Sequence, residues 1–591
     1  MRWTEPNGTR IWRCPAEGTT ADDVLNSAAF YTDAVLARLA EEGFNGIWVY
    51  ALLYNLMRSR VFPELNRPGT EERLTALQEL IDRARRHGIG VYLYLNDPVS
   101  IDIDDPFWQK YAELHGAEKW HTYALCTSTP QVQSFFRDAL ESTFAPLRNL
   151  EGVILITACE SLTHCWSKTV RRDGALPACP RCREREPAEL VLELLQTWSE
   201  VSHHHPTPFR ILAWNWEWAY WYPHPQLPIV SHLPDGMELL LGYEMGGTRR
   251  WGDRIIPVGE YAFSFAGPGE QFILTRQAAV ERGIPVHAKI ELNNTHEICS
   301  VPNVPVLRTL HARFAAMARD EVAGFLGCWS MGGKMTLNTH AMRLFLRDPE
   351  QYLDEQTFLA ALARDYFGLT ATNAITRAWQ QFSDAFTHYP FSVNLLYSGP
   401  HNDAPARRLS LHFAGTPICA SWHPGEPGDD LSRCIEPFFS DRQSFTLDDV
   451  IDGFTRLHAG WAEALRDYAA LEADEPGSEE QCLHRLRELS CARMIAHQFR
   501  SVVNVFRFFR EQQAVMQQHG LTAPCDIPPN ATLREIMEDE LANVRQALPL
   551  VEADSRLGYH QDIGGYKYNA EMMREKIGAM EAELVIHSWV R

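Results

Sequence analysis

The sequence predicts an α/β chain in which a (β/α)8 TIM barrel is followed by an α-helical C-terminal domain. From the start to about residue 350, short apolar runs rich in β-branched residues alternate with amphipathic helical stretches. Beyond that point helical spacing continues without comparable strands. A length of 591 residues fits two or more domains. We place them at residues 1–350 and 351–591.

Eight strands are expected in the barrel, each a short apolar run. They are Thr9–Arg13, Gly46–Ala51, Gly90–Leu95, Gly152–Thr157, Phe209–Asn215, Met237–Tyr243, Pro285–Glu291 and Gly324–Trp329. Helices between them are expected near Phe30–Glu42, Glu71–His87, Gln131–Leu147, Ala188–Ser202, Gln271–Arg282 and Val306–Arg319. The alternative is an open doubly wound sheet, which is disfavoured because no Gly-rich phosphate loop opens the chain.

The second domain is predicted from helical periodicity. Its helices are expected near Glu355–Tyr366, Ala371–His388, Leu447–Leu471, Glu479–Gln518, Thr532–Leu548 and Ala570–Ile586. The segment of about residues 400–444 is rich in Pro, Gly and Asp, which predicts an irregular insertion between these helices.

Composition excludes several classes of protein. Apolar residues make up 45% and charged residues 22% of the chain, as in ordinary globular proteins. A net charge of −21 repels phosphate backbones, so nucleic acid is not an expected partner. The N-terminus lacks a secretory pattern and no apolar segment approaches the ~20 residues that cross a bilayer, so we expect a cytoplasmic protein without a membrane partner. The sequence is compatible with a homo-oligomer.

Carboxylates recur at or just past the ends of the later strands, where barrel enzymes carry their chemistry. Cleavage of a glycosidic bond needs one carboxyl group as acid and a second group as nucleophile or stabiliser. Glu160 follows an almost wholly apolar strand and is the predicted general acid. The second carboxylate is predicted to be Glu291, or else Glu244 or Glu297. A lone Glu at a strand end can also be a solvated loop residue, but several neighbouring ones favour a site.

Residues for binding a carbohydrate substrate are predicted in the same loops. Indole faces stack on sugars, and amide and charged groups bind hydroxyls or carboxylates. The predicted set is Tyr54, Arg58, Asn215, Trp216, Glu217, Lys289, Asn293, Asn294 and Trp329. Each of these assignments has a structural alternative. The Asn side chains can build turns, Lys289 can form a buried ion pair, and Arg58 can form a structural salt bridge. No cofactor is expected for catalysis.

The 13 cysteines of a cytoplasmic protein are expected to be thiols or metal ligands rather than disulfides. Cys179 and Cys182 have a spacing that chelates Zn²⁺, and Cys165 is a natural third ligand for a structural zinc site. Cys14, Cys159 or His164 could be the fourth ligand. Free thiols or a redox pair are the alternatives. The His203–His205 run closes a predicted helix, where imidazoles suit the helix dipole and solvent.

Four segments, Ile154–Cys182, Ser264–Gly269, Lys289–Pro305 and Trp329–Gly333, resemble a group of bacterial barrel proteins classed beside the family-20-type hexosaminidases. The resemblance implies a glycosidase-like barrel with its acid at Glu160. Hexosaminidases of that type carry Asp directly before the acid to orient the substrate acetamide, whereas Cys159 stands here. The segments Asp554–Tyr559 and Tyr566–Asn569 are similar to tails that follow α-glucuronidase-like barrels.

The sequence therefore predicts a glycoside hydrolase that acts on O-glycosidic bonds. One alternative is an N-acetylhexosaminidase in which an acidic residue other than position 159 supports the acetamide. The other is a carbohydrate-binding barrel without catalytic activity, because fold alone does not fix function.

Overall fold

The computed structural model describes residues 2–13, 22–158, 161–414, 431–435, 445–473 and 476–586. Eight parallel strands close into a barrel in which spatial order follows chain order. They are β1 (Thr9–Trp12), β2 (Gly46–Tyr50), β3 (Gly90–Leu95), β7 (Gly152–Ile156), β8 (Arg210–Trp214), β9 (Met237–Gly242), β12 (Val286–Lys289) and β13 (Gly324–Leu326). Each lies within a predicted run. The barrel prediction is confirmed, and the open sheet is excluded.

Side chains of the barrel strands alternate between two apolar layers. Outward-facing residues such as Ile47, Val153 and Ile211 join the large core beneath the helices. The inward-facing ones form a separate interior core of Ile11, Trp48, Tyr92, Tyr94, Ile154, Ile156, Leu212, Trp214, Leu240 and Leu326. This alternation determines which side chains beyond each strand point into the mouth of the barrel.

A polar layer lies at the N-terminal end of the barrel interior. The Arg210 guanidinium donates to both carboxylate oxygens of Glu238, at 2.7 and 2.6 Å, and His287 Nε2 lies 2.5 Å from the same carboxylate. Burial alone would raise the pKa of Glu238, but the hydrogen bonds from His287 and Arg210 lower it to about 2. Polar groups at this end of a barrel stabilise the fold, because the chemistry belongs to the opposite face.

Six helices around the barrel agree with predicted ones to within a few residues, whereas the helices at Asp23–Phe30 and Leu337–Arg347 were not predicted. The main ones are α1 (Asp23–Phe30), α2 (Asp33–Glu41), α4 (Thr70–Arg86), α6 (Pro130–Phe144), α7 (Pro187–His204), α9 (Glu270–Glu281), α10 (Leu307–Arg319) and α11 (Leu337–Arg347). The predicted helix Phe30–Glu42 is wrong at its start. Thr32 is extended and its hydroxyl accepts a hydrogen bond from the Val35 N–H, so α2 begins after it.

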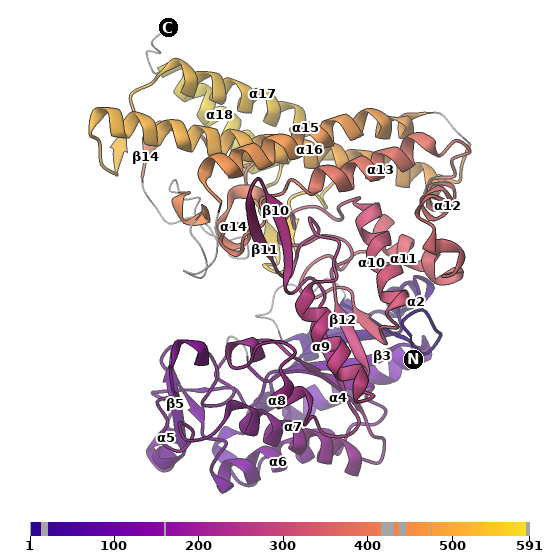
Figure 1. Cartoon of the computed structure of the whole chain (residues 1–591), viewed down its shortest axis with the longest axis vertical. Coiled ribbons are helices and arrows are strands. Elements are labelled where there is room, and N and C mark those ends of the chain that lie inside the picture. The colour runs from indigo at the N-terminus through magenta and orange to yellow at the C-terminus, as the bar shows by residue number, and fades with distance from the viewer. Residues whose placement is uncertain are drawn as a thin grey trace.

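Two β insertions that the sequence did not predict extend from the C-terminal ends of barrel strands. After β3, the strands β4 (Ile101–Asp102), β5 (His115–Lys119) and β6 (Thr122–Leu125) form a small sheet with α5 (Phe107–Tyr111). After β9, a hairpin of β10 (Gly247–Trp251) and β11 (Arg254–Val258) stands between the barrel and the helical domain (Figure 1). The short helices α3 (Leu53–Leu56) and α8 (Leu227–Val230) lie in other loops.

The C-terminal part of the chain is helical, as predicted, and its helices gather beyond the hairpin (Figure 1). They are α12 (Glu355–Phe367), α13 (Asn373–Phe386), α14 (Val393–Ser398), α15 (Leu447–Tyr468), α16 (Glu479–His519), α17 (Ala531–Ala553) and α18 (Ala570–Ile586). Two-residue strands pair as β14 (His412–Phe413) with β15 (Cys525–Asp526), and β16 (Tyr559–His560) with β17 (Gly565–Tyr566). Within the described ranges, every helix is too short or too polar to span a bilayer.

The predicted insertion at about residues 400–444 is described only in part. Residues 400–414 and 431–435 contain short 3-10 turns and β14, whereas residues 415–430 and 436–444 lie outside the described ranges. The domain boundary at residue 350 stays a prediction.

The loop after β12 joins the two domains. Its Cys299 N–H donates to Asn402 Oδ1 at 2.8 Å, and Gln498 Nε2 donates to Ser300 Oγ at 2.8 Å. The Tyr568 hydroxyl donates to the Ser300 carbonyl at 3.2 Å. The helical domain therefore packs on the C-terminal face of the barrel, where the candidate site lies.

Candidate active site

An aromatic floor lies at the C-terminal end of the barrel interior. We use this name for Trp48, Tyr94, Trp214 and Trp329. The Trp329 ring stacks on Trp48 with ring centroids 4.4 Å apart. It also makes edge-to-face contacts with Tyr94 and Trp214, at centroid distances of 4.7 and 4.9 Å. Trp329 is half-buried, whereas Trp48 and Trp214 are almost wholly covered. Trp329 is therefore the most accessible ring of the floor.

Lys289 and Glu291 both face the barrel interior at the end of β12. Lys289 pairs in register with the inward-facing Leu326, whereas Ile290 packs in the outer core. Lys289 Nζ lies 3.2 Å from Glu291 Oε1, and the Trp329 N–H donates to Glu291 Oε2 at 3.4 Å. The carboxylate therefore borders the aromatic floor.

The surroundings of Glu291 raise the pKa of its carboxyl group. The side chain is 2% exposed, and burial raises the pKa of its carboxyl group to about 7 even though Lys289 and the Trp329 N–H lower it. A carboxyl group with a pKa near neutrality can exist in either protonation state under physiological conditions, as acid–base chemistry requires.

Glu244, the predicted alternative after β9, is held by the outer helix α10. Arg313 Nη1 lies 2.8 Å from Glu244 Oε1, and both side chains are buried. The same guanidinium donates to the carbonyls of Ala262 and Phe265, at 2.5 and 2.9 Å. Glu244 thus helps to fasten the loops after β9 to the helix layer.

Glu297, the third candidate, fastens two loops together. Its carboxylate accepts hydrogen bonds from the Phe263 N–H at 2.5 Å, the Ser264 N–H at 3.1 Å and the Ser264 hydroxyl. Burial raises the pKa of Glu297 to about 7 against the lowering effect of these donors. Of the three candidate partners for the acid, Glu291 is the one that contacts the aromatic floor.

The amides of Asn293 and Asn294 build the loop after β12. Asn293 Nδ2 donates to the carbonyls of Gly332 and Lys334, at 2.6 and 2.5 Å. Asn294 Nδ2 donates to the Val301 carbonyl at 2.6 Å. These contacts favour the turn-building alternative over sugar binding for both residues.

The loop after β8 keeps its three predicted residues together. Trp216 is half-buried and its ring lies 5.5 Å from Trp214 of the floor. Asn215 Nδ2 donates to Gln226 Oε1 at 3.0 Å, and Glu217 forms an ion pair with Lys168. Of the three, Trp216 has the most direct contact with the floor.

Arg58 and Tyr54 do not join this cluster. Arg58 is 46% exposed in its side chain and pairs with Glu71 of α4 at 3.2 Å, which is the salt bridge expected as the alternative. The Tyr54 ring is buried and its hydroxyl donates to the Val99 carbonyl at 2.8 Å. Their contacts are with neighbouring loops and the outer helix α4 rather than with the aromatic floor, and their role in substrate binding stays a prediction.

Glu160, the predicted acid, lies outside the described residues. The adjoining loop is held by Thr157, whose hydroxyl accepts from Trp218 Nε1 at 2.9 Å and whose carbonyl accepts from the Thr163 hydroxyl at 2.5 Å. The loops after β7 and β8 are thus fastened to each other beside the barrel mouth.

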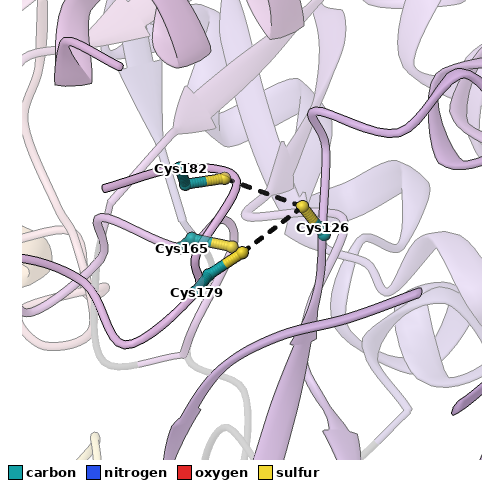
Figure 2. Close-up of side chains that lie close together, drawn as sticks. All are labelled: Cys126, Cys165, Cys179 and Cys182. Atoms are coloured by element: carbon teal, nitrogen blue, oxygen red, sulfur yellow. Dashed lines mark hydrogen bonds between the residues drawn. The ribbon is translucent and has the colours of Figure 1, made fainter. Parts of the chain in front are cut away.

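The predicted zinc ligands Cys165, Cys179 and Cys182 come together, and Cys126 joins them (Figure 2). Sequence reasoning missed Cys126 because it follows β6 in a different loop and no spacing motif marks it. Among the candidates for the fourth ligand, Cys14 and Cys159 lie outside the described residues. His164 is not in the cluster, and its Nδ1 accepts from the Trp166 N–H at 3.2 Å.

Two further groups near the mouth carried no signal in the sequence. Glu260 is 7% exposed, and a Cβ at Gly242, the last residue of β9, would meet its Oε1 at 2.8 Å. His560 of the helical domain is buried 6.2 Å from the His296 ring, which in turn lies 4.6 Å from Tyr261. The tail of the chain thus contributes to the border of the site.

No protein-family model matches the chain, and no curated protein matches it in sequence. Among solved structures, a glycoside hydrolase family 138 enzyme targeting pectin rhamnogalacturonan II has a TM-score of 0.52 at 10% identity, with coverage of 98% of this chain and 84% of that one. A mutant of the Thermobaculum terrenum O-GlcNAc hydrolase has a TM-score of 0.36 at 11% identity, covering 98% and 96%. The first of these likenesses shows that the two chains share an overall fold.

Proposed function

We propose that this protein is a glycoside hydrolase that cleaves O-glycosidic bonds with paired carboxylates at the C-terminal face of its barrel. The observation that carries the proposal is the buried Glu291, which faces inward beside the aromatic floor. Aromatic faces stack on sugar rings, and a carboxylate next to them can reach an anomeric carbon. The family 138 enzyme with the same fold is named as acting on a pectin polysaccharide, which supports a carbohydrate substrate here.

In this proposal Glu291 is the nucleophile and Glu160 the general acid. Glu291 attacks the anomeric carbon while Glu160 protonates the leaving oxygen; water then cleaves the glycosyl ester with Glu160 as base. Glu160 is assigned this role by its position in the sequence. Lys289 favours the ionised form of Glu291 that attack requires. Because the pKa of Glu291 is about 7, turnover should rise as the pH increases through neutrality.

The finer classification rests on sequence alone. Resemblance to proteins beside the family-20-type hexosaminidases and to α-glucuronidase-type tails supports including N-acetylated and uronic sugars among the candidate substrates. Cys159 in place of the acetamide-orienting Asp argues against acetamide assistance. We also propose a cytoplasmic location, because the described cysteines are free thiols, which a reducing compartment preserves.

The first experiment is a screen of aryl glycosides that includes uronic and N-acetylated sugars. For the substrate found, Glu291→Gln should lower turnover by about two orders of magnitude or more, the scale of losing a carboxyl group from the reaction. Glu238→Gln is the matched control, because it changes a buried inward-facing Glu at the opposite end of the barrel. Because Glu238→Gln also removes a stabilising carboxylate, turnover is compared at equal amounts of folded protein; equal losses there would contradict the proposed site.

The nucleophile can be identified by chemical rescue. If the enzyme retains configuration, azide should restore cleavage to Glu291→Ala and give a glycosyl azide of inverted configuration. Rescue of Glu244→Ala or Glu297→Ala instead would transfer the role to that residue. A sugar that stabilises the protein but is never cleaved across the whole screen would favour the carbohydrate-binding alternative and overturn the proposal.

A further inference from the structure

Four buried cysteine side chains meet between two loops on the C-terminal side of the barrel (Figure 2). Cys126 comes from the loop between β6 and α6, and faces the other three across a gap between segments. Cys165, Cys179 and Cys182 come from the loop between β7 and α7. Each residue is at most 1% exposed. The cluster is therefore a feature of the protein interior that connects two separate parts of the chain.

The spacing of the sulfur atoms fits a tetrahedral metal ion. Cys126 Sγ lies 3.7 Å from Cys179 Sγ and 3.6 Å from Cys182 Sγ, and all four Sγ atoms lie within 4.8 Å of one another. Zn–S bonds of about 2.3 Å in a tetrahedron place neighbouring sulfurs about 3.8 Å apart. A disulfide would require about 2.05 Å. The observed separations match four ligands around one ion rather than two covalent pairs.

The surroundings of the cluster suit thiolate ligands. Arg181 Nε lies 3.1 Å from Cys126 Sγ, and Ser128 Oγ lies 3.3 Å from Cys182 Sγ. A guanidinium and a hydroxyl offset the negative charge that four thiolates would leave on a zinc centre. Space is also reserved for the sulfurs, because a Cβ at Gly116 would meet Cys165 Sγ at 2.4 Å.

The Cys179–Cys182 turn directs its two sulfurs to one point. The N–H groups of Cys182 and Arg183 both donate to the Cys179 carbonyl, at 3.2 and 3.1 Å. This tight turn is the backbone form that lets a two-residue spacer present both thiolates to a single ion.

We propose that Cys126, Cys165, Cys179 and Cys182 bind one structural Zn²⁺. Each thiol would release its proton to solvent on binding, and no redox change is needed. Four protein ligands leave no open coordination position, so the ion would fix structure rather than act on substrate. The ion would fasten the loop of residues 157–186 to the loop before α6. The described part of residues 157–186 contains a single short 3-10 turn, at Arg171–Asp173.

Metal analysis of the purified full-length chain is the direct test. We expect about one zinc per chain, as for a closed four-ligand site. Cys126→Ser, which leaves the Cys179–Cys182 pair intact, should lower the zinc content at least several-fold. Cys491→Ser is the matched control: its thiol is also buried, but it lies in α16 and donates to the Asn303 carbonyl. The control should retain its zinc.

A measurement on the unmodified chain covers the case in which Cys126→Ser fails to fold. Protein produced with Co²⁺ in place of Zn²⁺ should show the intense visible absorption of a tetrahedral thiolate centre. A mercurial reagent should release the zinc of the native protein as it reacts with the four cluster thiols, after the exposed thiol of Cys482. Zinc-free protein from zinc-supplemented growth, together with no visible cobalt spectrum, would overturn the proposal. Iron in place of zinc would overturn the identity of the ion.

Discussion

The Lys289→Met substitution tests whether the lysine ammonium holds the buried carboxylate of Glu291 in its ionised form. Met keeps much of the apolar volume of the lysine stem but removes the charge 3.2 Å from Glu291 Oε1. An opposite charge at this distance lowers a carboxyl pKa by roughly one to three units. The substitution should therefore raise the pKa of Glu291 further above its present value of about 7.

The consequence for stability follows from the direction of this shift. A carboxyl group whose pKa is higher in the folded than in the unfolded protein costs stability as the pH rises above the unfolded value of 4.5, until the folded value is passed. At about pH 5.5 Glu291 is protonated in both folded proteins, so its contribution is the same. At about pH 8.5 the wild type has passed its folded pKa, whereas the folded pKa of the variant lies about one unit or more higher. The unfolding free energy of the variant is then lower by about a further 1–2 kcal/mol, because one pKa unit corresponds to about 1.4 kcal/mol.

Urea unfolding followed by tryptophan fluorescence at the two pH values measures this difference. We expect the gap in unfolding free energy between wild type and Lys289→Met to widen by about 1–2 kcal/mol from the lower to the higher pH. In a Glu291→Gln background the same lysine substitution should have an effect independent of pH. A gap of equal size at both pH values in the wild-type background would refute the ion-pair argument.

Three further substitutions test other parts of the barrel. Trp329→Ala should weaken binding of the substrate found in the screen about tenfold or more, measured by calorimetry, because it removes the accessible ring of the floor; unchanged affinity would exclude stacking there. Glu297→Gln should lessen the fall in stability between about pH 4.5 and 7, since burial raises the pKa of Glu297 to about 7, and an unaltered melting profile would argue against that shift. Glu238→Gln should lower the unfolding free energy at neutral pH by roughly 3 kcal/mol. The pKa of Glu238 is lowered to about 2 in the folded protein, so its carboxylate stabilises the fold fully at neutral pH. This stabilisation is lost only as the pH falls below 4.5. A variant as stable as wild type would contradict that.

The barrel could be predicted because its strands carry strong local signals. Gly90–Leu95 and Gly152–Ile156 are continuous apolar runs that begin with glycine, as strands buried on both faces should be. The hairpin after β9 gave no such signal. Its strand Gly247–Trp251 is mostly polar, and its residues alternate between exposed and partly buried. It reaches the helical domain through single contacts such as the hydrogen bond from Trp251 Nε1 to Asp449 at 3.0 Å. Contacts between domains are made by residues whose local pattern is that of a loop.

The site was predictable to the extent that it follows strand alternation. Glu291 lies two residues beyond Lys289, so both face the same side of β12. The partners that engage Glu244 and Glu297 could not be foreseen, because Arg313 and Ser264 lie tens of residues away in the chain. The same holds for Cys126. The sequence motif identifies the cysteine ligands of its own loop, whereas Cys126 lies in a different loop and comes near them only in the folded protein.

The contact between Ser300 and the helical domain has a consequence for how this protein can change. The loop after β12 carries Asn293 and follows Glu291, yet Gln498 and Tyr568 hold it from the other domain. A chimera with a foreign tail would leave these polar groups buried without partners and would let the loop relax. Changes in the tail would therefore alter the position of the loop that follows Glu291, and the two domains are expected to be inherited as a pair.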